Sequence, residues 1–139
     1  TPIAIMWLLA GYNIDLLGKN IVIVGQGRLV GRPLSQMLQK SGLEPIVIDE
    51  FTDNKEDLIS SADILISAAG SPGIISSDLL KHKAVVVDAG VTSDSGSLKG
   101  DVQDAVYERD DLKITKKKGG VGPLTVVALF DNVIKAASN

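Results

Sequence analysis

The stretch Asn20-Ile-Val-Ile-Val-Gly25-Gln26-Gly27-Arg28-Leu29-Val30-Gly31 decides the fold of this chain. Its first half is an unbroken apolar run, which is typical of a central parallel strand buried on both faces. Its second half places three glycines before a segment with helical spacing. In such a strand–turn–helix unit, the first glycine permits the tight turn and the second lets a pyrophosphate approach the backbone. The third lets the helix and the strand pack closely.

The spacing of these glycines is GxGxxxG, whereas the commoner dinucleotide-binding pattern is GxGxxG. The pattern alone therefore leaves a purely structural turn as open as a binding turn. Its position between a buried strand and a helix favours binding, because N–H groups at a helix N-terminus face the phosphates of a bound nucleotide. The residues expected to contact the cofactor here are Gly25, Gln26, Gly27, Arg28 and Gly31.

The remainder of the chain continues the alternation of strands and helices. Further strands are predicted over residues 45–49, 63–67, 84–88 and, at an edge, 112–115. Helices are predicted over residues 2–11, 31–40, 55–61 and 124–137. We expect Ser76 or Ser77 to cap a short turn at 78–80, and residues 92–99 to form a polar loop. The alternation predicts an α/β fold, a Rossmann-like, doubly wound and mainly parallel sheet with flanking helices, as one domain over residues 1–139.

Composition narrows the possible functions. The formal net charge of −3 and the pI of about 5.0 argue against nonspecific binding to nucleic acid or to an anionic membrane. The absence of cysteine excludes disulfides and thiolate metal sites. No apolar stretch approaches the roughly 18 residues that a membrane span needs. We therefore expect a cytoplasmic protein, and the lack of an initiator Met suggests that the chain begins inside a longer reading frame.

The ends of the later strands provide the other candidate binding residues. Asp49 and Glu50 close the second strand, where an acid commonly binds the ribose hydroxyls of NAD. A solvated strand end is the alternative. Either acid would repel a 2′-phosphate, so NAD is favoured over NADP. Small residues after the third and fourth strands would let the nicotinamide ribose come close, although they could equally be simple turns: Ala69, Gly70, Gly90 and Val91.

The sequence offers little that could catalyse a reaction. His82 is the only histidine, and its lysine neighbours indicate a solvated turn. Asp63 and Asp88 flank buried strands and are expected to be turn and cap residues. No metal-ligand cluster and no Ser/His/Asp arrangement is recognisable. We therefore predict no catalytic residue and no metal site within this chain.

Several blocks nevertheless resemble the C-terminal domain of the bifunctional methylenetetrahydrofolate dehydrogenase/cyclohydrolases. They include Val30-Gly31-Arg32-Pro33, Val87-Asp88-Ala89-Gly90 and Gly100-Asp101-Val102. The most specific is Gly119-Gly120-Val121-Gly122-Pro123-Leu124-Thr125, which is similar to the GGVGPMT signature of that family. The resemblance covers essentially the whole chain.

The resemblance implies two reactions and a division of labour between two domains. Methylenetetrahydrofolate is oxidised by hydride transfer to the nicotinamide, and the methenyl product is hydrolysed to 10-formyltetrahydrofolate. The catalytic tyrosine and lysine belong to an N-terminal domain that is not part of this chain, so the chain alone should be inactive. It would bind the cofactor and form one wall of the folate cleft, within a homodimer. The substrate-side loop would comprise Gly119, Gly120, Val121, Gly122, Pro123 and Thr125.

Three departures from the family pattern affect these expectations. Gly25-Gln26-Gly27 replaces Gly-Arg-Ser, and Ile48-Asp49-Glu50 replaces Cys-His-Ser, which again favours NAD over NADP. Lys116-Lys117-Lys118 replaces Pro-Val-Pro beside the folate and leaves the folate geometry open. Two alternatives therefore remain: a noncatalytic nucleotide-binding module, and the cofactor domain of another two-domain NAD dehydrogenase.

Overall fold

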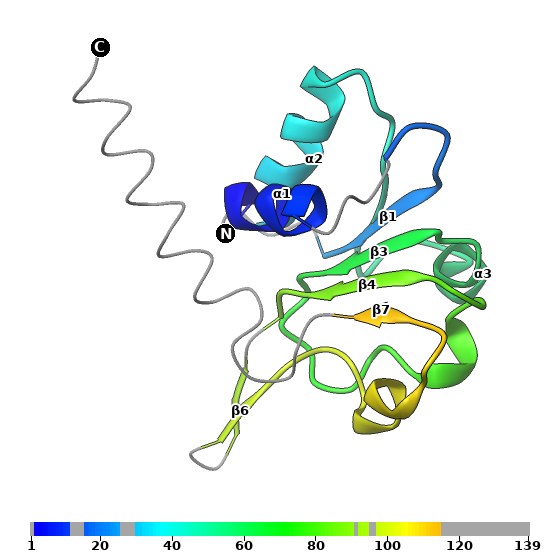
Figure 1. Cartoon of the computed structure of the whole chain (residues 1–139). Helices are drawn as coiled ribbons and strands as arrows, with labels where there is room; N and C mark the ends of the chain where they lie inside the picture. Colours follow the sequence, from blue (N-terminus) through cyan, green and yellow to red (C-terminus); the bar gives the residue numbers. More distant parts are fainter. Residues whose placement is uncertain (1, 12–15, 26–29, 91, 95–96, 115–139) are drawn as a thin grey trace.

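The computed structural model describes residues 2–11, 16–25, 30–90, 92–94 and 97–114, whose arrangement Figure 1 shows. The predicted helix over residues 124–137 and the predicted substrate-side loop lie outside the described residues.

The apolar runs of the sequence form one parallel sheet. Its strands are β1 (Ile21–Val24), β2 (Ile46–Ile48), β3 (Ile64–Ser67), β4 (Val85–Asp88) and β7 (Lys113–Ile114). They pair in the order β2-β1-β3-β4-β7, and every pairing is parallel. In the central register, Ile23 of β1 lies between Val47 of β2 and Ile66 of β3. The predicted parallel sheet and its edge strand are both confirmed.

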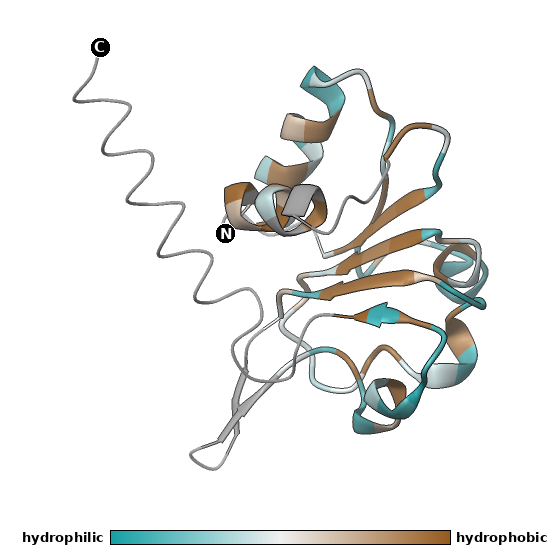
Figure 2. Cartoon of the chain, in the orientation of Figure 1, coloured by the Kyte–Doolittle hydropathy of each residue, from teal (hydrophilic) through white to brown (hydrophobic). Residues whose placement is uncertain are grey.

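Helical elements cover both faces of this sheet. They are α1 (Pro2–Gly11), α2 (Gly31–Lys40), α3 (Lys55–Ser60) and the 3-10 turns η1 (Ser77–Leu79) and η2 (Asp104–Glu108). Successive strand residues point to opposite faces. Ile21 and Ile23 accordingly pack with α1 and α2, whereas Val22 and Val24 belong to the core on the side of α3. Figure 2 shows the apolar strands between these layers, and the predicted doubly wound architecture is confirmed.

Two local predictions were wrong. The expected loop over residues 92–99 is an antiparallel hairpin of β5 (Thr92–Asp94) and β6 (Ser97–Lys99). Its backbone pairing requires no apolar pattern, and the Ser95-Gly96 pair between the strands was an overlooked hairpin signal. Ser76 does precede η1, but its side chain makes no capping hydrogen bond there.

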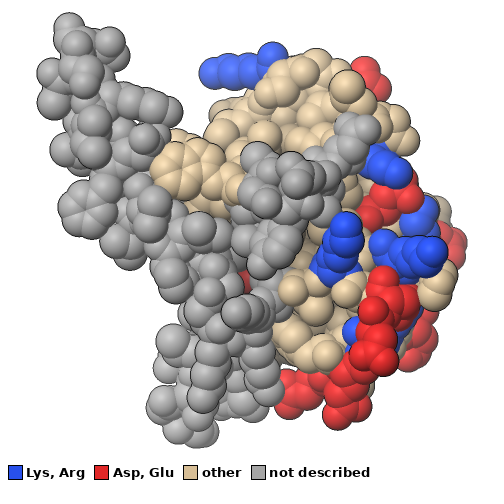
Figure 3. Space-filling view, in the orientation of Figure 1, with Lys and Arg blue, Asp and Glu red and all other residues tan. Residues whose placement is uncertain are grey.

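The charged residues on the visible face are mixed in sign. Figure 3 shows Lys and Arg beside Asp and Glu on the side that carries α3, with mainly uncharged atoms over α1. On the described part of this face, no extended surface is purely basic. Such mixing gives a phosphate backbone little net attraction.

Candidate cofactor-binding site

The order of the strands reverses between β1 and β3, and ligands of open α/β sheets bind outside the carboxyl ends of strands at such a point. Gly25 lies there, directly after β1. Its N–H donates to the carbonyl of Ile48, at 2.7 Å, and its φ is +101°. A Cβ on this residue would lie 2.6 Å from the carbonyl oxygen of Ala68. Only glycine fits this close approach of two backbones.

The turn leads into α2 at its N-terminus. Gly31 is buried as the first residue of α2, as expected for a glycine that lets helix and strand pack closely. The N-cap residue is Val30, whose side chain cannot cap the first N–H groups of the helix. Gln26, Gly27 and Arg28 lie outside the described residues.

The loop after β3 forms the next part of this edge. Ala69 and Gly70 are exposed, as is Ser71. On its inner side the loop meets the carboxylate of Asp101, which is fully buried. Asp101 accepts hydrogen bonds from the Ser67 hydroxyl at 2.6 Å, the Ala69 N–H at 2.8 Å and the Ser71 N–H at 2.9 Å. The three donors satisfy an acid that would otherwise be costly to bury.

Asp88 ends β4 next to this acid. Its carboxylate accepts the N–H groups of Gly90 and Asp101, both at 3.1 Å, and that of Val102 at 3.2 Å. The Tyr107 hydroxyl lies 3.4 Å from the same carboxylate. Burial raises the pKa of Asp88, and these N–H bonds offset part of the shift. Burial, followed by the charge of Asp88, also raises the pKa of Tyr107. Asp88 is therefore a cap residue, as predicted.

The expected acids after β2 lie at the same edge. Asp49 closes a turn on itself, because its Oδ1 accepts the Phe51 N–H and the Thr52 hydroxyl, both at 2.9 Å. The hydrogen bond from the Thr52 side chain and the one from Phe51 lower the pKa of Asp49, so the residue is anionic at neutral pH. Glu50 is exposed, and Phe51 is 83% exposed beside it. Two negative charges therefore stand at the end of β2.

The structure brings the predicted residues to one edge of the sheet. The described ones are Gly25, Gly31, Asp49, Glu50, Ala69, Gly70 and Gly90; Val91 lies outside the described residues. Sequence reasoning missed Asp101 as the residue that holds this edge together. The available signal is the acid between Gly100 and Val102, which the resemblance identifies only as part of a family block.

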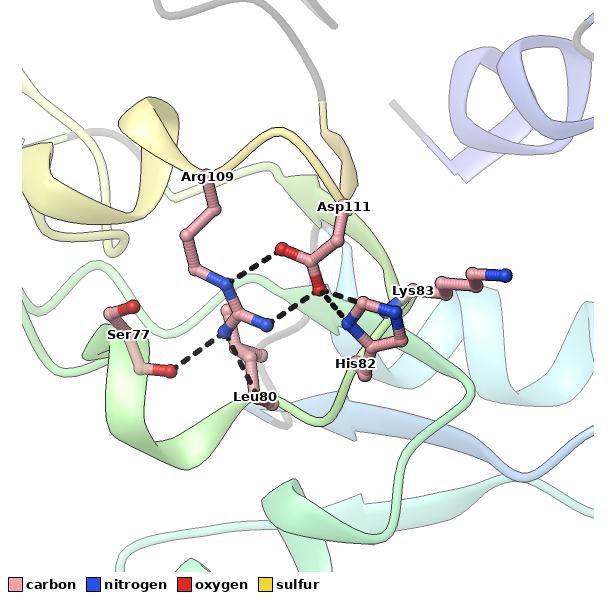
Figure 4. Close-up of polar contacts among 6 residues, drawn as sticks. All are labelled: Ser77, Leu80, His82, Lys83, Arg109 and Asp111. Atoms are coloured by element: carbon pink, nitrogen blue, oxygen red, sulfur yellow. Dashed lines mark hydrogen bonds and ion pairs between the residues drawn. The ribbon is translucent and has the colours of Figure 1, made fainter.

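A second polar cluster, also missed, lies at the opposite edge, before β4 and β7 (Figure 4). Arg109 donates from Nε to Asp111 Oδ1 at 3.0 Å and from Nη2 to Oδ2 at 2.7 Å. Its Nη1 donates to the carbonyls of Ser77 and Leu80. His82 Nδ1 lies 3.0 Å from Asp111 Oδ2, and the His82 side chain is exposed. The cluster ties η1, η2 and the start of β4 together, away from the candidate site.

The Arg109–Asp111 pair predicts a specific dependence of stability on pH. The hydrogen bond from Arg109 and the one from the Lys83 N–H lower the pKa of Asp111 in the folded chain. A lowered folded-state pKa contributes stability above the unfolded value of about 3.9, and that contribution is lost as pH falls further. We expect Asp111→Asn to unfold at lower denaturant concentration at pH 7, with the difference from the wild type shrinking between pH 4 and pH 2. A difference that stays constant across this range would contradict the assignment.

Two further features are absent from the described residues, a metal-ligand cluster and a membrane-spanning helix. No group of three or more His, Cys, Asp or Glu side chains is placed to hold a metal ion there. In the same part of the chain, no helix has both the length and the apolar character needed to cross a membrane.

The chain is similar to known proteins over its whole length. Residues 1–139 match the family described as tetrahydrofolate dehydrogenase/cyclohydrolase, NAD(P)-binding domain. The chain is 40% identical over 136 residues to the bifunctional protein FolD of Fusobacterium nucleatum. This match covers 98% of the chain and 48% of that relative. The corresponding values for FolD of a Hydrogenobaculum species are 42% identity, 98% of the chain and 49% of the relative. The chain therefore spans about half the length of the curated relatives it matches.

Solved structures agree with these matches. The crystal structure of the bifunctional enzyme FolD from Campylobacter jejuni has a TM-score of 0.90 at 38% identity, covering 99% of this chain and 49% of that one. A methylenetetrahydrofolate dehydrogenase-cyclohydrolase from Trypanosoma brucei, complexed with NADP and an inhibitor, has a TM-score of 0.85 at 33% identity. This structural match covers 96% of this chain and 48% of the Trypanosoma brucei chain.

Proposed function

Because this chain belongs to the tetrahydrofolate dehydrogenase/cyclohydrolase NAD(P)-binding domain family, we propose that it is the cofactor half of such an enzyme. The observation that carries the proposal is the position of Gly25. The residue lies at the reversal of strand order, where the lack of a Cβ lets its backbone approach that of Ala68. The start of α2, which has no side-chain cap, follows it in the chain. This arrangement fits a pyrophosphate, which needs close access to the backbone and N–H donors.

Each candidate residue then has a proposed role along the carboxyl edge. Gly25, Gln26, Gly27, Arg28 and Gly31 would surround the pyrophosphate. Asp49 and Glu50 would face the adenosine ribose, and Ala69, Gly70, Gly90 and Val91 the nicotinamide ribose. The loop of residues 119–125 would face the folate. We further propose a single domain over the chain, which is supported by two buried clusters on opposite faces of one sheet among the described residues.

The proposed reaction is that of the family. Methylenetetrahydrofolate would be oxidised by hydride transfer to the bound nicotinamide, and the methenyl product would be hydrolysed to 10-formyltetrahydrofolate. The residues of this chain would hold and orient the cofactor and form one wall of the folate cleft. No described residue is assigned to proton transfer, and the catalytic tyrosine and lysine would come from an N-terminal half. We further propose a homodimer in the cytoplasm.

The reaction is tested by joining this chain to the N-terminal half of the Fusobacterium relative. We expect the joined protein to reduce the dinucleotide when it is given methylenetetrahydrofolate, and the chain alone not to do so. Dinucleotide binding by a joined protein that has no activity would favour a noncatalytic binding module. Gel filtration with light scattering of the same sample tests the homodimer.

The proposal includes a preference for NAD over NADP. A 2′-phosphate near the end of β2 would meet the charges of Asp49 and Glu50, and Gln26 offers no compensating cation. Like charges a few ångströms apart repel each other, and salt screens only part of this repulsion. The Trypanosoma brucei relative is complexed with NADP, whereas the preference for NAD is proposed for this chain alone. We expect this chain to bind NAD at least several-fold more tightly than NADP when both are titrated by calorimetry in the same buffer.

Paired variants locate the source of this preference. Asp49→Ser/Glu50→Ser should reduce the difference between the affinities for NAD and NADP. The control Asp78→Ser/Asp110→Ser removes two exposed acids near the Arg109 cluster, and should leave this difference unchanged. Equal wild-type affinities, or a preference for NADP, would show that the acids after β2 do not face the 2′ position.

A further inference from the structure

We infer that Asp101 is a positioning residue for the dinucleotide site, because its buried carboxylate fixes the loop of residues 68–71 against which Gly25 packs. The inference rests on the proposed function and extends it to a residue that makes no contact with the solvent. Asp101 would act through this loop and not by touching the cofactor.

The contacts of Asp101 bridge a strand and the loop that follows it. Oδ2 accepts the Ser67 hydroxyl, at the end of β3, and the Ala69 N–H. Oδ1 accepts the Ser71 N–H. One carboxylate thus spans five residues of chain and replaces the sheet hydrogen bonds that end with β3. Such a buried acid with several donors holds its neighbours in one geometry.

Asp101 is itself held from the other side. Its N–H donates to Asp88 Oδ1 at 3.1 Å, and its carbonyl accepts the Ile75 N–H at 3.0 Å. Gln103 continues the connection, because its N–H donates to the carbonyl of Ile75 at 2.9 Å. Val102 and Ile75 form the bridge between the two segments. The carboxylate therefore has a fixed base from which to orient the loop.

The loop in turn contacts Gly25, the residue that follows β1. The Ala68 N–H donates to the carbonyl of Val24 at 2.7 Å, which continues the pairing of β3 with β1. A Cβ on Gly25 would overlap the backbone of Ala68 and Ala69, so Gly25 lies directly against this loop. A Cβ on Gly90 would likewise overlap the Asp101 carboxylate. The Asp101 side chain therefore lies at the ends of β3 and β4, beside the loop that contacts Gly25.

The direction of the donors defines what the loop can offer to a ligand. The N–H groups of Ala69 and Ser71 point inward to Asp101, while residues 69–72 are exposed on the outer side. The two amides are thus committed to Asp101 and are not donors to a cofactor. Small changes in loop position cost binding energy when a ligand must fit a preformed surface.

The test compares Asp101→Asn with two matched variants. The amide keeps the shape of Asp101 but turns one accepting oxygen into a donor, so a loop or strand hydrogen bond is lost. Asp111→Asn makes the same change in the cluster at the opposite edge. Ser67→Ala removes the donor on β3 but leaves both loop N–H bonds. Folding is followed by denaturant unfolding, and NAD and NADP binding by calorimetry.

We expect all three variants to lose stability, but only Asp101→Asn to weaken dinucleotide binding, by about tenfold (~1.4 kcal/mol). Wild-type affinity in folded Asp101→Asn, or an equal loss of affinity in Asp111→Asn, would overturn the inference. A wild-type chain that binds neither dinucleotide would instead overturn the proposed function.

Hydrogen exchange on the wild-type chain keeps the inference testable if Asp101→Asn does not fold. The Ala69 and Ser71 amides should be protected in the absence of any dinucleotide, although both residues are exposed. Exchange as fast as that of an unprotected loop, with protection only after NAD or NADP is added, would overturn the inference.

Discussion

Replacement of Gly25 by alanine is expected to lower the free energy of unfolding by about 3–5 kcal/mol and to abolish most dinucleotide binding. Two costs add. The backbone of Gly25 has a φ of +101°, which a residue with a Cβ adopts only under strain. The new Cβ would also lie 2.6 Å from the carbonyl oxygen of Ala68 and 2.9 Å from the Cα of Ala69. Neither neighbour is a flexible side chain, so β1 and β3 would have to separate.

A second glycine provides the matched control for this variant. Gly42, after α2, has a φ of +85°, but nothing lies within 4 Å of where its Cβ would be. Gly42→Ala should therefore cost only the conformational strain, about 1–2 kcal/mol, and should leave binding intact. Denaturant unfolding and calorimetry of both variants separate the two effects. Equal losses of stability would mean that the contact with Ala68 contributes little.

The sheet was predictable because its evidence is local. Four-residue runs such as Ile21–Val24 and residues 84–87 are apolar throughout, which indicates strands covered on both faces. Gly42, just beyond α2, marked the end of that helix correctly. The family resemblance, carried by blocks spread over the chain, was confirmed for residues 1–139.

What the sequence could not provide depends on contacts between distant residues. Asp101 lies 30 to 34 positions from the donors Ser67, Ala69 and Ser71, and nothing in its own surroundings indicates which groups it would meet. The Arg109–Asp111 pair is local, but its contacts with Ser77 and Leu80 arise only when the strands are ordered. The hairpin over residues 92–99 was missed for another reason. It is formed by backbone pairing within a polar segment.

The second glycine of the turn should differ from the first in its effect on stability. Gly27→Val would put a side chain where a pyrophosphate must approach the backbone, so we expect at least about 100-fold weaker dinucleotide binding. The expectation derives from the sequence pattern, because Gly27 lies outside the described residues. Stability should change little compared with Gly25→Ala, since the obstructed partner is the ligand and not another strand. Calorimetry, with circular dichroism to monitor folding, measures both properties.

Leu29→Val is the control within the same turn, because it changes an apolar side chain without adding a Cβ at a glycine. It should bind the dinucleotide as the wild type does. If folded Gly27→Val also retained wild-type affinity, the phosphates would not lie against this turn. In that case Gly25 would be a structural glycine only, and its contact with Ala68 would explain the glycine at that position without any ligand. Loss of binding in Gly27→Val alone, with loss of stability in Gly25→Ala, would instead assign the second glycine to the cofactor and the first to the fold.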